Sequence, residues 1–349
     1  MENLFVDIAG SLRATLENVG LSSFLTDTAM VLIKVVAILV FILLNAIWLI
    51  YMERKVCGYI QCRPGPNRVG PKGLFQSLAD ALKLFGKEII TPSEVDKTLY
   101  ILAPILIFAP PLLIFAVIPF GEGMAAIDMN IGVFYALAVT SLATVIFWMA
   151  GWSSNNKYSL LGGMRVVAQM VSYELPLVLS LLGVVMITGT LNMSEIVRSQ
   201  QHIWFIFTQP LAFLIYFIAA LSESNRAPFD LIEGEQEIIA GPFTEYSGMA
   251  FAMFYLTEYA NVLLISFMCA ILFLGGWLAP FGWTFIPGWL WLFIKVYLMI
   301  FIIMWIRWTF PRIRVDQLMG FGWKVLLPLS LANIFVTGLG IKIFEMMGW

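Results

Sequence analysis

Charged side chains are scarce in this chain. Only 12% of its 349 residues are Asp, Glu, Lys or Arg, whereas 60% are hydrophobic, and the mean hydropathy is +0.89. Soluble domains carry about a quarter charged residues. The scarcity of charge excludes an ordinary soluble protein and predicts an all-α polytopic membrane protein. The net charge of −2 indicates no particular partner, and we expect no nucleic acid to bind.

Residues that hold metals are equally few. The chain has three cysteines, Cys57, Cys62 and Cys269, and one histidine, His202. No four-ligand set for zinc or an iron–sulfur cluster can be assembled from them. The sequence also lacks a Gly-x-Gly-x-x-Gly motif and a Walker-type loop. We therefore expect no metal site and no nucleotide site of either kind.

Long apolar runs dominate what is present. Eight of them approach or reach the roughly 20 residues that cross a bilayer; they cover residues 28–52, 99–119, 131–151, 166–187, 204–221, 249–277, 289–306 and 325–344. We expect about eight transmembrane helices in a single membrane domain, residues 1–349. A weakly amphipathic segment, residues 1–27, predicts an N-terminal helix lying at the interface.

Basic residues are distributed unequally between alternate loops. Most of them follow the first, third, fifth and seventh runs, and the loops on the other side hold only Arg13 and Arg198. By the positive-inside rule, the four polar loops face inward and both termini face outward.

The first inward loop, residues 53–98, combines fixed turns with an amphipathic segment. It begins with Glu53 and Arg54, and the prolines and glycines of residues 63–73 force a non-helical path. Apolar residues at helical spacing then predict a surface helix on the inner leaflet. A plain membrane anchor explains its apolar face but not Asp80, because an anionic leaflet does not attract a carboxylate.

The densest acidic stretch is residues 221–259, which includes the predicted inward loop 222–248. Its acids are Glu223, Asp230, Glu233, Glu235, Glu237, Glu245 and Glu258. Arg226 is the only base among them. A solvated loop explains the central glutamates but not Glu258, which falls inside the sixth apolar run. An ionisable residue at membrane depth usually marks a functional site.

The fourth apolar run contains a second carboxylate at membrane depth. Arg165, Gln169 and Ser172 share one side of this predicted helix, and Glu174 projects from the opposite side. Pro176 leaves the Ser172 carbonyl without its helical hydrogen bond. The pattern indicates a stop for a proton or water, and a structural hydrogen bond between two spans is the alternative.

Five motifs carry a family resemblance. They read ERKVCGYIQCRPGPNRVG, ADALKLFGKE, GWSSNNKYSLLGGMRVVAQMVSYE, ESNRAPFDLIEGEQEIIAGPFTEY and RWTFPRIRVDQLMGFGWKVLLP. Together with the eight-span layout they resemble the H-subunit family of the proton-translocating NADH:quinone oxidoreductase, respiratory complex I. The mitochondrial homologue of this family is NADH dehydrogenase subunit one.

The resemblance implies roles for both groups of charged residues. Positions lining or flanking the quinone path are Glu53, Arg54, Arg63, Asp80, Arg226 and Arg307. Positions of an acidic chain that leads from the quinone chamber to antiporter-like subunits are Glu174, Glu223, Glu233, Glu235, Glu237, Glu245 and Glu258. Asp230 belongs to the same motif as several of these acids.

The resemblance also implies a setting. Quinone, either ubiquinone or menaquinone, is the substrate and is not bound covalently, and flavin and iron–sulfur clusters belong to partner subunits. The implied partners are the peripheral-arm quinone-site and iron–sulfur subunits, small membrane subunits, antiporter-like subunits and membrane lipid. The expected location is the bacterial inner membrane.

Two other functions fit parts of the sequence. One is the membrane subunit of an energy-converting hydrogenase or formate hydrogenlyase, and the other is an independent transporter or channel. The complete QCRPGPNRVG loop and Asp80 favour the quinone enzyme over the hydrogenase. Long inward loops with fixed turns favour a docking surface over a transporter that acts alone.

Overall fold

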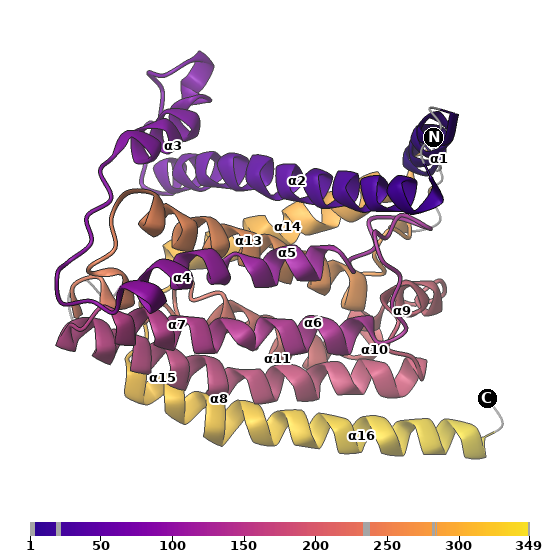
Figure 1. The fold of residues 1–349 in the computed structure, drawn as a ribbon. Coiled ribbons are helices and arrows are strands. Elements are labelled where there is room, and N and C mark those ends of the chain that lie inside the picture. Colours follow the sequence, from indigo (N-terminus) through magenta and orange to yellow (C-terminus); the bar gives the residue numbers. More distant parts are fainter. Residues whose placement is uncertain (1–3, 19–21, 233–237, 281–282, 284, 348–349) are drawn as a thin grey trace.

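The computed structural model describes residues 4–18, 22–232, 238–280, 283 and 285–347. These residues form a helical bundle without strands (Figure 1). The α-helices are α1 (Leu4–Asn18), α2 (Ser23–Ile60), α3 (Gln76–Gly86), α4 (Lys97–Ile107), α5 (Ala109–Phe115), α6 (Gly132–Thr140), α7 (Leu142–Ser153), α8 (Lys157–Thr188), α9 (Met193–Ser199), α10 (Phe205–Thr208), α11 (Pro210–Glu223), α13 (Gly248–Phe273), α14 (Gly288–Thr309), α15 (Val315–Phe321) and α16 (Leu327–Met346).

The all-α polytopic fold predicted from the apolar runs is confirmed. Within the described residues, seven helical segments are long and apolar enough to cross a membrane. They are Ser23–Ile60, Lys97–Phe115, Gly132–Ser153, Lys157–Thr188, Gly248–Phe273, Gly288–Thr309 and Val315–Ile343. Each overlaps one of the predicted spans.

The remaining predicted span, residues 204–221, is divided. It forms α10, which has 4 residues, and α11, which has 14. The break lies at Gln209, whose φ of −130° and ψ of 54° are not helical, and Pro210 starts the next helix. Proline has no N–H for the preceding turn and fits the first position of a helix. The eighth apolar helix is therefore shorter than the roughly 20 residues of a full span.

Helix α2 is longer than the run that predicted it. It continues beyond residue 52 to Ile60, so Glu53, Arg54 and Cys57 lie on its last turns. The chain then forms the irregular 61–75 segment with a short 3₁₀ turn (Pro71–Gly73) and continues into α3, the predicted surface helix. Leu82 and Phe85 on α3 are 65% and 68% exposed, as expected for an apolar face that lies on a membrane or a partner.

Helix α8 lies at the centre of the packing, against α7, α11 and α16. Small residues permit the close approach: a Cβ added at Gly151 of α7 would lie 2.9 Å from the Ser159 carbonyl oxygen. A Cβ at Gly162 would lie 2.5 Å from Gly241 in the 3₁₀ turn Gly241–Phe243. Helices in membranes commonly associate through such small residues.

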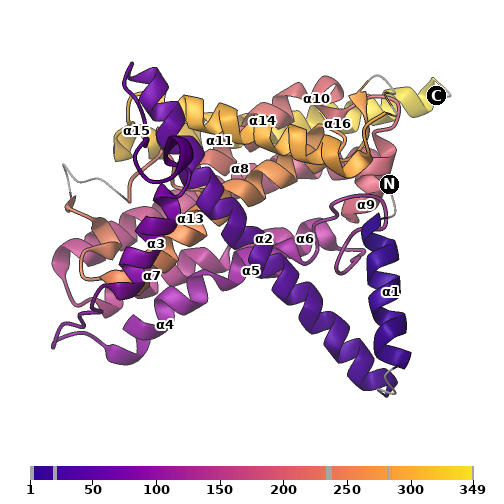
Figure 2. The ribbon, with the colours of Figure 1, turned by 90° about the horizontal axis from the view of Figure 1, so that it is seen from above.

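The two ends of the chain lie at the same end of the bundle, opposite α3 and α15 (Figure 1). This arrangement agrees with an even number of crossings, and the outward orientation of the termini stays a prediction. Seen from above, the first half of α2 stands away from the bundle beside α1 (Figure 2). Arg13 of α1 pairs with Asp27 of α2 at 3.1 Å and connects the two helices.

Candidate functional site

A buried network of charges lies where α2, α13 and α14 meet the loop after α11. Its centre is Arg226, which is 3% exposed. One terminal nitrogen of Arg226 donates to both carboxylate oxygens of Glu53, at 3.2 and 3.1 Å. Its Nε forms an ion pair of 2.8 Å with Glu258 of α13, and the guanidinium lies 4.3 Å from the centre of the Tyr259 ring. Glu53 also pairs with Arg307 of α14.

The network balances two guanidiniums against two carboxylates. Burial lowers the pKa of Arg226, but the carboxylates of Glu258 and Glu53 outweigh burial and hold that pKa above its ordinary value. Arg226 is therefore charged. Buried charges persist only when paired in good geometry, and removing one partner is strongly destabilising. The network therefore joins three helices through ionic contacts in addition to apolar packing.

A pocket of about 490 Å³ opens beside this network. Its walls are Glu53, Arg54, Cys57, Gly58, Arg63, Pro64, Gly65, Pro66, Tyr259, Arg307 and Trp308. The 63–66 segment folds back over the end of α2, where the Arg63 backbone N–H donates to the Gly58 carbonyl at 2.9 Å. A Cβ at Gly58 would lie 2.9 Å from the Arg63 carbonyl oxygen, so glycine permits this contact.

The predicted quinone-path residues are thus mostly brought together. Glu53, Arg54, Arg63 and Arg307 line one pocket, and Arg226 contacts its wall through Glu53. Asp80 does not line it. Its ion pair with Arg54 fixes α3 against α2, and it also accepts from Gln76 Nε2 of its own helix at 3.2 Å. The Arg63 Nε donates to Gln61 Oε1 at 2.7 Å, so Arg63 also holds its own loop.

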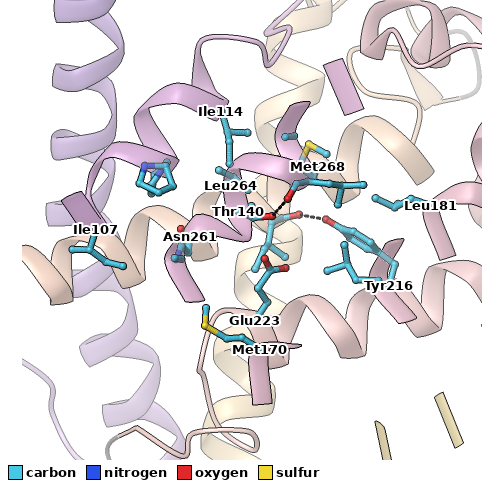
Figure 3. A pocket seen from close by; sticks show the side chains of 17 residues that line it. Ile107, Ile114, Thr140, Met170, Leu181, Tyr216, Glu223, Asn261, Leu264 and Met268 are labelled. Atoms are coloured by element: carbon cyan, nitrogen blue, oxygen red, sulfur yellow. Dashed lines mark hydrogen bonds between the residues drawn. The ribbon is translucent and has the colours of Figure 1, made fainter. Parts of the chain in front are cut away.

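A second site lies inside the bundle around Glu223, the last residue of α11. A cavity of about 30 Å³ is walled mainly by apolar side chains of α4, α5, α6, α7, α8, α11 and α13. Its polar lining residues are Thr140, Tyr216, Glu223 and Asn261. Figure 3 shows the Glu223 carboxylate pointing towards Thr140. The volume exceeds the ~10–15 Å³ that one water needs.

Glu174 belongs to the same region. It lies four residues after Met170 and three before Leu177, and both of these line the cavity, so the three share a face of α8. Glu174 is close enough to Glu223 for their charges to repel each other. Two neighbouring carboxylates in apolar surroundings do not both ionise readily.

Glu245 lies apart from both groups, near the link between α7 and α8. Its carboxylate accepts from Asn156 Nδ2 at 2.7 Å, and its backbone carbonyl accepts from the Tyr100 hydroxyl at 2.7 Å. Tyr100 stacks on Tyr246 with ring centres 4.3 Å apart. Burial raises the pKa of Tyr246 to about 12.

The predicted acidic chain is thus distributed over three places: Glu258 in the charge network, Glu174 with Glu223 at the cavity, and Glu245. Glu233, Glu235 and Glu237 lie outside the described residues. In the part of the chain that the structure describes, no cluster of His, Cys, Asp or Glu suits a metal ion. Sequence reasoning missed Thr140, Tyr216 and Asn261, because single polar residues inside apolar runs carry no distinguishing signal.

Comparisons with known proteins agree with this architecture. Residues 33–338 match the family model described as NADH dehydrogenase. The chain is 58% identical over 348 residues to the H subunit of NADH-quinone oxidoreductase from Carboxydothermus hydrogenoformans, covering 100% of this chain and 99% of that protein. It is 53% identical over 312 residues to the protein of the same name from Dehalococcoides mccartyi, covering 89% and 87%. It is 51% identical over 296 residues to that of Bacillus cytotoxicus, covering 84% and 89%.

Proposed function

Because this chain belongs to the H-subunit family of NADH-quinone oxidoreductase, and is thus a multi-pass membrane component of an oxidoreductase complex, we propose that it helps form the chamber in which quinone is reduced and couples that reduction to proton translocation. The observation that carries the proposal is the buried Glu53–Arg226–Glu258 network, which Arg307 extends into the wall of the pocket.

The pocket has the charges that quinone reduction requires. A quinone headgroup that gains electrons becomes negative until it is protonated, and fixed positive groups stabilise such a charge. Arg54, Arg63 and Arg307 place guanidiniums in the pocket wall. The large apolar surfaces of Tyr259 and Trp308 also line it and suit contact with the quinone ring.

The network can transmit the arrival of negative charge. Arg307 is shared between the pocket and Glu53, so an anion in the pocket competes with Glu53 for this guanidinium. Glu53 then depends more strongly on Arg226, which weakens the hold of Arg226 on Glu258. Coulomb forces in a buried site are stronger than in water, so a change of charge near Arg307 and Glu53 alters the interaction between Arg226 and Glu258.

The cavity supplies the groups that exchange protons. Arg226 lies three residues after Glu223, so a shift of the guanidinium acts directly on the end of α11. Glu223 and Glu174 repel each other and share protons between them, as coupled carboxylates do. The number of protons that Glu223 and Glu174 hold therefore responds to charge in the network. A proton released from this pair passes onward to membrane partners.

This function sets the chain in a larger assembly. We propose that flavin and iron–sulfur clusters reside in peripheral subunits, that the quinone is ubiquinone or menaquinone, and that antiporter-like and small membrane subunits receive the proton. The proposed location is the bacterial inner membrane. The exposed apolar face of α3 and the exposed first half of α2 are suited to lipid and neighbouring subunits.

The test uses Arg307→Gln in the assembled complex. Quinone-linked NADH oxidation should fall at least tenfold, because an aligned charge that stabilises a transition state contributes that much or more. Electron entry to a soluble artificial acceptor should be unchanged. Arg312→Gln, an exposed position in the loop after α14, is the matched control. Normal quinone reduction by Arg307→Gln would contradict the proposed chamber.

A further inference from the structure

Three buried polar atoms without a protein partner lie at the end of α11, just after it, and on the α8 residue that is hydrogen-bonded to that end. They are Gln169 Oε1, Ser222 Oγ and Asn225 Oδ1. The three residues are 0%, 0% and 5% exposed, so neither bulk water nor a neighbouring subunit reaches them. Buried polar atoms in folded proteins almost always have a partner, and an internal water is the usual one.

The orientation of the Gln169 amide is determined by its surroundings. Its Nε2 donates to two backbone carbonyls, those of Ser222 at 2.7 Å and Phe229 at 2.8 Å. If the amide were flipped, its oxygen would face two carbonyl oxygens, so only one assignment is chemically acceptable. Gln169 Oε1 is therefore an acceptor that points away from both carbonyls.

The residues that carry the other two atoms, Ser222 and Asn225, are linked to Gln169 through the Ser222 carbonyl. The Ser222 carbonyl accepts from the Asn225 backbone N–H at 3.2 Å and also from Gln169 Nε2. Gln169 and Asn225 are therefore held beside the same carbonyl. Asn225 Nδ2 donates to the Glu223 carbonyl at 3.4 Å, which leaves Asn225 Oδ1 as a second acceptor. The Ser222 hydroxyl can donate or accept.

We propose that Gln169, Ser222 and Asn225 bind an internal water that bridges Arg226 and Glu223, and that these neutral residues position it for proton transfer. Two amide oxygens accept the two O–H groups of a water, and the serine hydroxyl donates to its lone pair. A cation is disfavoured because the Arg226 guanidinium is the next residue after Asn225. An anion is disfavoured by the two acceptor oxygens.

The placement of this site gives it a role. Ser222, Asn225 and the two charged residues Glu223 and Arg226 lie within one turn of chain, with Gln169 of α8 holding that turn. None of the three residues is a carboxylate, so the proposed water site is separate from the acidic residues of the predicted chain. The role in proton transfer rests on the proposed function, whereas occupancy by water does not.

The first experiment is a map of the intact complex at a resolution that shows ordered water. We expect a peak within hydrogen-bond distance of Gln169 Oε1 and Ser222 Oγ. A map that shows ordered waters elsewhere in the bundle but none at this point would overturn the proposal. This outcome is independent of whether the chain translocates protons.

The second experiment measures turnover in Ser222→Ala and Asn225→Gly. Asn225 has a φ of 53°, which glycine adopts without strain, so the second variant removes Oδ1 but preserves the backbone. Each should lower quinone-linked NADH oxidation and proton translocation about three- to tenfold, as the loss of one buried hydrogen bond does. The solvent deuterium isotope effect should rise, which a merely structural residue would not cause.

Two controls make the result specific. Ser266→Ala removes an equally buried hydroxyl whose partner is its own helix carbonyl, that of Val262 at 2.8 Å, and should leave all readouts unchanged. Glu223→Gln in the same assay tests the proposed function. If Glu223→Gln blocks turnover while Ser222→Ala and Asn225→Gly match the wild type, the water bridge is overturned. If Glu223→Gln is also silent, the proposed function itself fails and the conducting role of the bridge fails with it.

Discussion

The charge network and the Glu223 cavity hold carboxylates in opposite ways. Glu53 and Glu258 are each paired with a guanidinium, and the network contains as many positive as negative groups. Glu223 instead shares a largely apolar cavity with Thr140 and Asn261, and the charge that acts on it is that of another carboxylate, Glu174. Pairing keeps a carboxylate ionised, whereas apolar surroundings and a like charge favour its protonated form. The difference is the basis of the proposed division, in which the network senses charge and the cavity exchanges protons.

Removal of Arg226 should produce the largest effect. Arg226→Met leaves Glu53 and Glu258 without their shared partner, and breaking a buried ionic pair in this way costs about 3–5 kcal/mol. We expect little assembled complex and a lower unfolding temperature for what remains. Arg13→Met, which removes an ion pair that is more than half exposed, is the control and should change neither. A normal yield of Arg226→Met complex would contradict the structural role of the network.

Glu223→Gln should affect activity without affecting assembly. The amide keeps the shape of the side chain but has no exchangeable proton, so quinone-linked turnover and proton translocation should fall together by at least tenfold. Glu195→Gln, at an exposed position of α9, serves as the control. Turnover that persists while translocation alone is lost would show that the cavity conducts protons without controlling quinone reduction.

Thr140→Val should have an intermediate effect. Valine has nearly the same shape as threonine, so the cavity keeps its volume and Glu223 loses only a neighbouring hydroxyl. Turnover should fall about fivefold, equivalent to about 1 kcal/mol for one hydrogen bond. Thr188→Val is the control, because the Thr188 hydroxyl donates to the Val184 carbonyl of its own helix, as the Thr140 hydroxyl does to the Leu137 carbonyl, but Thr188 does not line the cavity. Unchanged turnover in Thr140→Val would remove Thr140 from the exchange site.

Asp80→Asn should have the smallest effect. Its ion pair with Arg54 is between one third and one half exposed, and such pairs contribute less than about 1 kcal/mol. Thermal stability should be nearly unchanged, while the apparent KM for quinone rises a few-fold because α3 is held less firmly at the pocket. Asp316→Asn breaks a more exposed pair with Arg314 and should leave KM unaltered.

The helices were largely predictable, because apolar runs and helical periodicity are local properties of the sequence. The same reasoning found α3 and placed Glu174 on the face opposite Gln169. It missed the break at Gln209, since a proline at the start of a helix and a proline inside one look alike within an apolar run. The extension of α2 to Ile60 was hidden by the charged residues at its end.

The contacts of the site were much harder to predict. Glu53 and Arg226 are separated by 173 positions, and Glu53 and Arg307 by 254, so no local pattern links them. The motif resemblance identified these residues but assigned Glu258 to the acidic chain and Arg226 to the quinone path. The structure joins both in one network, and this joining comes from helix packing, which the local sequence does not encode.

The most direct measurement is an infrared difference spectrum of the assembled complex, recorded between its oxidised and quinone-reduced states. We predict a carboxylic acid band that changes on reduction, is lost in Glu223→Gln and is retained in Glu53→Gln. A band that persists in Glu223→Gln but disappears in Glu53→Gln would contradict the division between a charge-sensing network and a proton-exchanging cavity.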